Sequence, residues 1–216
     1  MEPGEHYRGQ RHALSELFAG LDADQLRATV PGCPRWQVRD LLGHLVGLTV
    51  SVRTGDMADA GSPAWTQRQV DARRDRSVPD LLQEWGTEAP AFEAGLAGLG
   101  FLGWVVVYDV TLHGDDAREA LGLPLGSSET HQLVLDGIVA RARTRADGLG
   151  TLTLHAGSRS WELGAGEPTA SLTVPDEGEL SRVVAARRSD DAVRGHAWTG
   201  DPEPWIDVLP LFRAGR

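Results

Sequence analysis

The spacing of the apolar residues changes once along this chain, near residues 146–150. Before that point apolar residues recur at three- and four-residue intervals, which is typical of helices that pack through one face. After it they alternate with polar residues in TLTLHAG, RSWELG and TASLTVP, which is typical of strands that bury one face. The pattern predicts an α+β protein, with a helical domain over 1–148 and a small α+β domain over 149–216.

The first part of the chain contains four long segments with helical spacing. We expect helices over about 4–20, 37–53, 77–99 and 101–121, and a fifth that begins near residue 128. Ser77, followed by Pro79, has the pattern of a helix start, and the glycines and proline of GLPLG are typical of a helix end. These segments predict an up-and-down four-helix bundle. The polar stretch 54–76 reads as a long connection, helical in part at best, and it is a place where a substrate could be recognised.

The second part is expected to begin with a meander of the three alternating segments. An amphipathic helix over DEGELSRVVAARR, a strand over AVRGHAW and a last helix around PWIDVLPLF should follow.

Composition excludes several classes of function. The 216 residues carry a net charge of −10, which disfavours a nucleic-acid partner. The longest strongly apolar run, near FLGWVVVY, is far shorter than the ~20 residues that span a bilayer, and the first residues lack the apolar stretch of a signal peptide. We therefore expect a cytoplasmic protein with no membrane partner, either a monomer or a homodimer. All 21 basic residues are arginine, which excludes Schiff-base chemistry on this chain.

The helix expected over 101–121 carries acids and a histidine among its apolar residues. At about 100° per residue, Asp109, His113 and Asp116 fall within one apolar sector, whereas Asp115 falls outside it. A buried carboxylate must be paired, hydrogen-bonded or bound to a metal. Asp109 and His113 lie one helical turn apart, so both side chains can reach the same point.

His44 is the expected third member of this group. It borders the apolar stripe of the helix over 37–53 and should face the interior of the bundle. A carboxylate and two imidazoles from packed helices predict a three-ligand metal site with an open position. Two other interpretations stay open: His44 as a hydrogen-bonded core residue, and Asp109 with His113 as an ion pair. Asp116 is better explained as a hydrogen-bonding group in the second shell than as a fourth ligand.

The remaining reactive side chains show no such pattern. Cys33, the sole cysteine, precedes Pro34 in a loop and has no evident base, which disfavours a catalytic thiol and excludes an internal disulfide. The seven tryptophans read as core and interface residues. The other histidines have no partner at ligand spacing and are expected to be structural or exposed: His6, His12, His131, His155 and His196.

Two segments resemble a known family. VPGCPRWQVRDLLGHLVG resembles the proline–tryptophan approach to the second helix in the mycothiol-dependent maleylpyruvate isomerase family, which has a DinB-like fold. VVVYDVTLHGDDAREALGLP resembles the second signature of that family, and the C-terminal part is similar to the sterol-carrier-like domain often attached to it. The resemblance implies metal binding by His44, Asp109 and His113. The chain departs from the family at Asp109, where glutamate is usual, and at Asp115, where tryptophan is usual.

The resemblance also implies an activity. It points to an enzyme in which a divalent metal, with zinc the ion expected for these ligands, activates the thiol of mycothiol for S-transfer to, or isomerisation of, a small electrophilic substrate. The absence of lysine and asparagine indicates a GC-rich genome, which fits an actinobacterium that makes mycothiol. Two alternatives remain: a non-catalytic small-molecule binding or resistance protein, and a metal-free DinB-like enzyme of a biosynthetic pathway.

Overall fold

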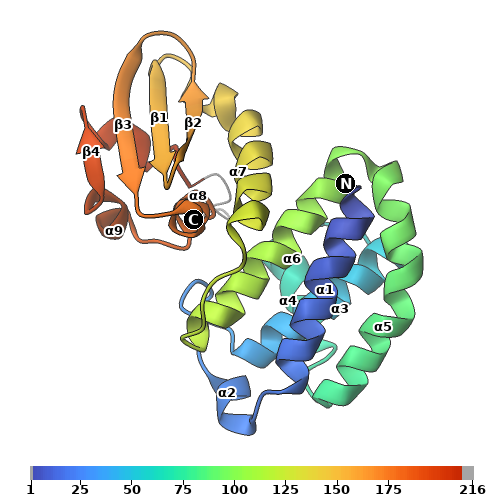
Figure 1. The fold of residues 1–216 in the computed structure, drawn as a ribbon. Helices are drawn as coiled ribbons and strands as arrows, with labels where there is room; N and C mark the ends of the chain where they lie inside the picture. Colours follow the sequence, from blue (N-terminus) through green and yellow to red (C-terminus); the bar gives the residue numbers. More distant parts are fainter. Residues whose placement is uncertain (1, 211–216) are drawn as a thin grey trace. The chain divides into compact units, whose positions relative to one another are not determined.

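The computed structural model describes residues 2–210, apart from the side chains of residues 143 and 144. Two compact units, Met1–Pro124 and Leu125–Arg216, divide the chain (Figure 1). The first is helical and the second contains a sheet, so the expected α+β class is confirmed. The division falls earlier than residue 148. The helix α7 (Ser128–Ala142), which the sequence placed with the helical domain, lies in the second unit because it packs against α8 and β2 of that unit.

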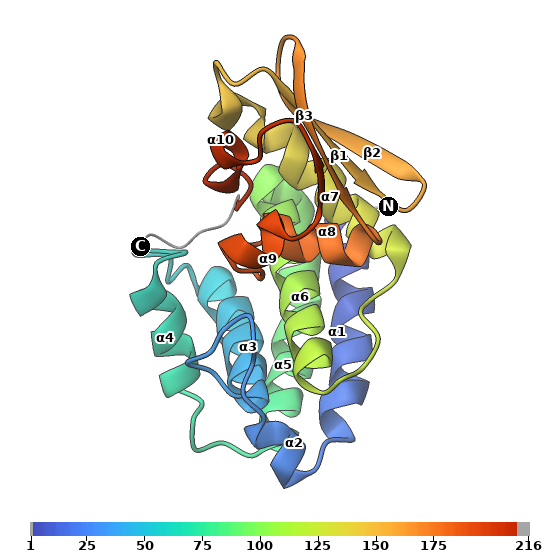
Figure 2. The same ribbon diagram turned by 90° about the vertical axis from the view of Figure 1, so that its left-hand side faces the viewer.

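Four long helices form the first unit, as the sequence predicts. They are α1 (Pro3–Ala19), α3 (Val38–Thr54), α5 (Val78–Gly95) and α6 (Phe101–Ala120). The helices α1 and α3 each pack against both α5 and α6, which closes a four-helix bundle (Figure 2). The bundle core includes the buried aromatic residues Tyr7, Phe18, Trp85 and Phe92. Burial of this apolar surface is the main contribution to the stability of the unit.

Short helices connect the long ones. They are α2 (Ala23–Arg27), α4 (Pro63–Asp71) and the 3₁₀ turn η1 (Leu96–Leu99). The helix α4 lies within the stretch 54–76 that the sequence marked as a connection. Ser62 caps it by accepting a hydrogen bond from the backbone N–H of Trp65 at 3.1 Å. Because Trp65 and Gln69 are buried and α4 packs against α3, this stretch is part of the bundle.

The ends of α3 and α6 are defined by local chemistry. At the start of α3, the Asp40 carboxylate accepts from the backbone N–H of Gln37 at 2.9 Å, and Gly55 ends the helix with a φ of 77°. The helix α6 ends at Ala120, just before the GLPLG stretch as expected, and Gly122 in that stretch has a φ of 65°. There the backbone N–H of Leu123 donates to the carbonyl of Arg118 at 2.9 Å. These caps fix the length of the two helices that carry the candidate site.

The sheet of the second unit has a topology that the sequence did not predict. Its strands are β1 (Thr151–Ala156), β2 (Arg159–Gly164), β3 (Pro168–Val174) and β4 (Ala197–Thr199), in the order β2-β1-β3-β4. The expected meander is wrong, because β3 pairs in parallel with β1 instead of with β2. Residues 165–167 cross the start of β1, where the backbone N–H of Thr151 donates to the backbone carbonyl of Glu167 at 2.9 Å. A Cβ on Gly164 would lie 2.2 Å from the Gly150 carbonyl oxygen, so this crossing requires glycine.

One face of the sheet is apolar, with Leu152, Leu154, Leu163 and Leu172 buried on it. The helix α8 (Glu177–Val184) packs against β1, β3 and α7. The strand predicted over AVRGHAW is only partly present. Its first residues belong to the helix α9 (Asp190–Arg194), and its last two belong to β4. Ser189 starts this helix by accepting from Ala192 N–H at 3.2 Å.

The last predicted helix is shorter than expected. It is limited to α10 (Glu203–Ile206), and residues 211 and 212 of the prediction lie outside the described residues. Within residues 2–210, no helix combines the length and the apolar character needed to cross a bilayer.

Candidate metal centre

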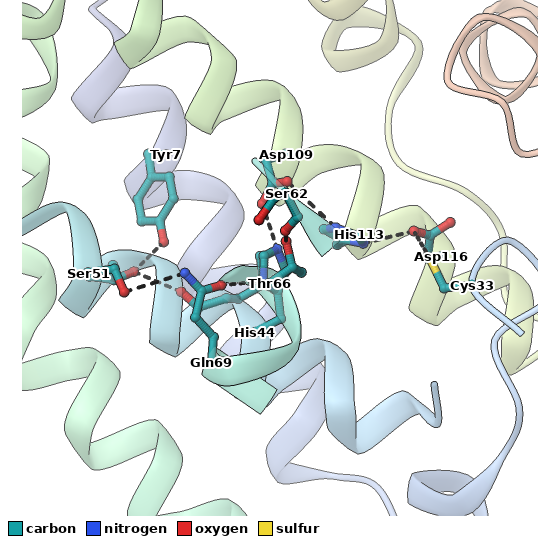
Figure 3. Close-up of polar contacts among 12 residues, drawn as sticks. Tyr7, Cys33, His44, Ser51, Ser62, Thr66, Gln69, Asp109, His113 and Asp116 are labelled. Carbon is teal, nitrogen blue, oxygen red and sulfur yellow. Dashed lines mark hydrogen bonds and ion pairs between the residues drawn. The ribbon is translucent and has the colours of Figure 1, made fainter. Parts of the chain in front are cut away.

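The structure brings His44, Asp109 and His113 together inside the bundle (Figure 3). His44 Nε2 lies 3.3 Å from Asp109 Oδ2, and His113 Nε2 lies 3.6 Å from Asp109 Oδ1. The three ligand atoms of the group all lie within 4.8 Å of one another. Two ligands of a tetrahedral zinc ion, each at about 2.0–2.1 Å from it, are separated by about 3.3 Å. The spacing of these side chains therefore fits a divalent cation.

Asp109 reaches both imidazoles although its side chain is one methylene shorter than glutamate. Its two carboxylate oxygens face different rings, Oδ2 toward His44 on α3 and Oδ1 toward His113 on α6. The contact between α3 and α6 makes this possible. An aspartate at this position is therefore compatible with the same ligand set.

The other nitrogen of each imidazole, Nδ1, contacts a buried polar side chain. His44 Nδ1 lies 2.8 Å from Gln69 Oε1, and His113 Nδ1 lies 2.9 Å from Asp116 Oδ2. An amide oxygen and a carboxylate oxygen are acceptors, so both contacts favour a proton on Nδ1. With its proton on Nδ1, each ring would have an Nε2 lone pair available to a cation that Asp109 also binds. Two imidazole nitrogens and a carboxylate around one point suit a bound cation. Histidines that bind a metal usually donate their other ring N–H to an acceptor, as the two Nδ1 atoms can here.

Burial differs among the three residues. The side chains of His44 and His113 are 3% and 9% exposed, whereas that of Asp109 is 28% exposed. The imidazoles are therefore closed in by protein, and solvent reaches the site on the side of Asp109. An exogenous ligand of small size can approach from this side.

Trp36, which precedes α3, lies against both imidazoles. Its ring centroid is 5.3 Å from that of His44 and 5.8 Å from that of His113. Its Nε1–H donates to Gln67 Oε1 at 3.2 Å, which fixes the indole against α4. From the sequence alone, this residue was expected to be one of the core and interface tryptophans. Its place in the proline–tryptophan approach to α3 was the signal that could have identified it as part of the site.

Cys33 lies closer to a carboxylate than the sequence suggested. Its thiol donates to Asp116 Oδ2 at 3.8 Å, so the expectation that this loop cysteine has no nearby base is wrong. Cys33, His113 and Asp116 form a second group with ligand atoms near one another. However, the 2.9 Å separation of His113 Nδ1 and Asp116 Oδ2 is that of a hydrogen bond. We therefore interpret this group as a chain of hydrogen bonds behind His113.

The remaining candidates lie away from this centre. Asp115 is only 2% exposed. It is therefore buried, although it lies outside the sector of α6 that contains Asp109. Among the described residues, two groups of three side chains meet the spacing of a shared cation, and neither contains another histidine. His6 packs against Trp104, and His196 lies 3.1 Å from Glu179. His12 and His155 are exposed, and His131 is buried.

Tyr7 links three helices of the bundle beside the centre. Its hydroxyl lies 2.8 Å from Thr49 Oγ1, and the indole N–H of Trp85 donates to it at 3.1 Å. Burial raises the pKa of Tyr7 above its usual range, and the charge of Asp109 adds to this effect. Tyr7 therefore stays protonated and acts as a hydrogen-bonding group of the core.

Comparison with known proteins identifies the family. The family model described as Mycothiol maleylpyruvate isomerase N-terminal domain matches residues 7–122, more than half of the chain. The chain belongs to this family. The match to the mycothiol maleylpyruvate isomerase N-terminal domain includes His44, Asp109, His113 and Asp116, and it ends close to the boundary of the first unit.

Two solved structures share the fold of this family member over most of its length. A crystal structure of the mycothiol-dependent maleylpyruvate isomerase is 13% identical with a TM-score of 0.62, and the alignment covers 91% of each chain. A crystal structure of a histidine-to-alanine mutant of that isomerase is 14% identical with a TM-score of 0.58, again over 91% of each chain. No significant match was found among curated proteins.

Proposed function

We propose that this chain is a metal-dependent enzyme that activates the thiol of mycothiol for isomerisation of, or S-transfer to, a small electrophilic substrate. The observation that carries the proposal is the convergence of His44 Nε2, His113 Nε2 and the Asp109 carboxylate on one point. Membership of the mycothiol maleylpyruvate isomerase family supports mycothiol as the thiol.

In this proposal His44, Asp109 and His113 hold the cation, and zinc is the ion that two imidazoles and one carboxylate favour. Gln69 and Asp116 hold the two rings in the orientation that metal binding needs. Bound there, the cation would favour the thiolate form of a thiol and polarise an oxygen of the substrate.

The nucleophile is expected to come from outside the chain. Cys33 is the sole cysteine, and its thiol lies against Asp116, whose negative charge disfavours a thiolate at that position. The partly exposed Asp109 marks the side from which an external thiol can enter. Trp36 shields the imidazoles with an apolar ring, which excludes water from that side of the site.

The test combines metal removal with a thiol-dependence assay. Purified protein is measured for zinc, stripped with a chelator and reloaded, and turnover of maleylpyruvate is followed with and without mycothiol. We expect turnover to require both metal and mycothiol. His44→Ala should lose metal and activity, whereas the exposed His155→Ala should keep both. Full turnover by protein stripped of metal would overturn the proposal.

The same assay separates the two reactions. Isomerisation changes the double bond of the substrate from cis to trans, at the same position, and returns the thiol unchanged. S-transfer consumes one thiol for each product and leaves a thioether. Counting free thiol at the end of the reaction therefore distinguishes an isomerase from a transferase.

A further inference from the structure

The helix α4 supplies a buried amide to the candidate metal centre. We infer that Gln69 is a positioning residue: it holds His44 in the tautomer that carries its proton on Nδ1, and thereby sets the affinity of the site for metal. This inference deepens the proposed function and rests on it.

The orientation of the Gln69 amide is fixed at both ends. Its Oε1 lies 2.8 Å from His44 Nδ1, and its Nε2 donates to Ser51 Oγ at 3.4 Å (Figure 3). Gln69 and Ser51 are 4% and 8% exposed, so water competes little for these bonds. With its NH₂ group directed to Ser51, the amide presents its oxygen to the imidazole, and an oxygen can only accept. This contact favours a proton on Nδ1 of His44, whereas Asp109 Oδ2, 3.3 Å from Nε2, competes for a proton on the other nitrogen until a cation lies between them.

A close approach of α4 to α3 makes this contact possible. A Cβ built on Gly47, one turn after His44, would lie 2.5 Å from Gln69 Cβ and 2.9 Å from Gln69 Cγ. Real side chains do not approach so closely, so any larger residue at position 47 must push Gln69 away. Gly43, one turn earlier on the same face, is less crowded: its Cβ would meet Arg73 Cβ at 3.6 Å, an ordinary contact. These two glycines provide a matched pair of sites for testing the contact.

The tautomer matters because only an unprotonated nitrogen can bind a metal. A neutral imidazole in water favours the proton on Nε2, the nitrogen that faces Asp109 in this site. Asp109 Oδ2 favours the same form, and the Gln69 oxygen opposes it by accepting a proton from Nδ1. Asp116 does the same for His113, but it is charged, whereas Gln69 is neutral. Loss of such an outer partner typically lowers metal affinity by about 10–100-fold.

Zinc affinity, measured by competition with a chromophoric chelator, is the first test. We expect Gln69→Leu to weaken binding by about 10–100-fold. Gln69→Glu should bind like the wild type, since a carboxylate oxygen also accepts from Nδ1. Ser51→Ala removes the group that orients the amide but keeps the amide itself, so its affinity should fall less than that of Gln69→Leu.

The second measurement is independent of metal and of activity. Nitrogen-15 NMR of the metal-free protein at neutral pH reports which nitrogen of His44 carries the proton. We expect a larger population with the proton on Nδ1 in the wild type and in Gln69→Glu than in Gln69→Leu, where only Asp109 still faces the ring as an acceptor. Gly47→Ala should behave like Gln69→Leu in both measurements, and Gly43→Ala like the wild type.

Two results would overturn the inference: a Gln69→Leu protein with wild-type zinc affinity and an unchanged His44 tautomer, or equal losses in Gln69→Leu and Gln69→Glu. The second result would mean that Gln69 acts only through packing. If the wild type fails to bind zinc, the proposed function fails, and the NMR comparison still decides the role of Gln69. If Gln69→Leu does not fold, Gly47→Ala and Gln69→Glu supply the same comparison.

Discussion

His44 and His113 meet edge to face at the centre of the bundle, with ring centroids 4.8 Å apart and ring planes at 80° to each other. The two rings come from different helices, and each directs its Nε2 toward Asp109. A perpendicular pair lets the two nitrogens approach a common point from different directions, as the ligands of a tetrahedral ion must. The site therefore depends on how α3 packs against α6. Substitution of a candidate ligand, or of a residue that hydrogen-bonds to one, should change the affinity of the protein for metal.

The charge of Asp109 should be essential for metal binding. Asp109→Asn keeps the size of the side chain and removes its charge, so we expect zinc affinity to fall by more than the about 10–100-fold typical of outer-shell changes. Asp109→Glu carries the residue usual in the family and should retain bound metal. Titration with a competing chelator measures both variants. Wild-type affinity in Asp109→Asn would show that this carboxylate is not a ligand.

Asp116 should act on the metal through His113. Asp116 is fully buried and accepts from His113 Nδ1, so Asp116→Asn is expected to lower zinc affinity by about 10–100-fold. The neighbouring Asp115 is also buried but lies outside both ligand groups. Asp115→Asn is therefore the control for loss of a buried charge. An equal loss of affinity in the two variants would contradict a specific role for Asp116.

Replacement of the cysteine distinguishes the two candidate ligand groups. Cys33→Ser keeps a hydroxyl donor toward Asp116 and removes the sulfur ligand. We expect it to bind zinc in wild-type stoichiometry and to keep mycothiol-dependent turnover, because the proposed nucleophile is exogenous. Elemental analysis and the turnover assay check this. Loss of metal in Cys33→Ser would favour the group of Cys33, His113 and Asp116 as the metal centre.

Ionisation of Tyr7 should make the protein less stable at high pH. Burial raises the pKa of Tyr7 in the folded state, so above about pH 10 the unfolded chain releases this proton while the folded chain retains it. The unfolded state then binds fewer protons, and the free energy of unfolding falls by up to about 1.4 kcal/mol per pH unit. Below pH 9 both states are protonated and the effect vanishes.

Tyr7→Phe isolates this contribution. At pH 7 the variant should lose about 1 kcal/mol, because Trp85 and Thr49 each lose a hydrogen-bond partner. Above pH 10 its free energy of unfolding should fall less steeply than that of the wild type. Urea unfolding between pH 8 and pH 11 measures both effects. Parallel pH profiles for the two proteins would show that Tyr7 has an ordinary pKa.

The sequence by itself determined the relationships within single elements. Helical spacing predicted the four helices of the bundle, and it placed Asp109 and His113 on one face because they lie one turn apart. The end of α6 just before Gly122 and the start of α5 at Ser77 followed from residues with strong local preferences. Such features are readable because the backbone hydrogen bonds of a helix repeat with a fixed geometry.

Only the tertiary structure decided the relationships between elements. Gln69 contacts His44 across 25 residues, in a stretch whose polar composition marked it as a connection, and Trp36 looked like any other core tryptophan. The sequence also did not predict the parallel pairing of β1 with β3 or the place of α7 in the second unit. Periodicity shows which face of an element is buried but not against which partner, because the partner is selected by packing among side chains that are remote in sequence.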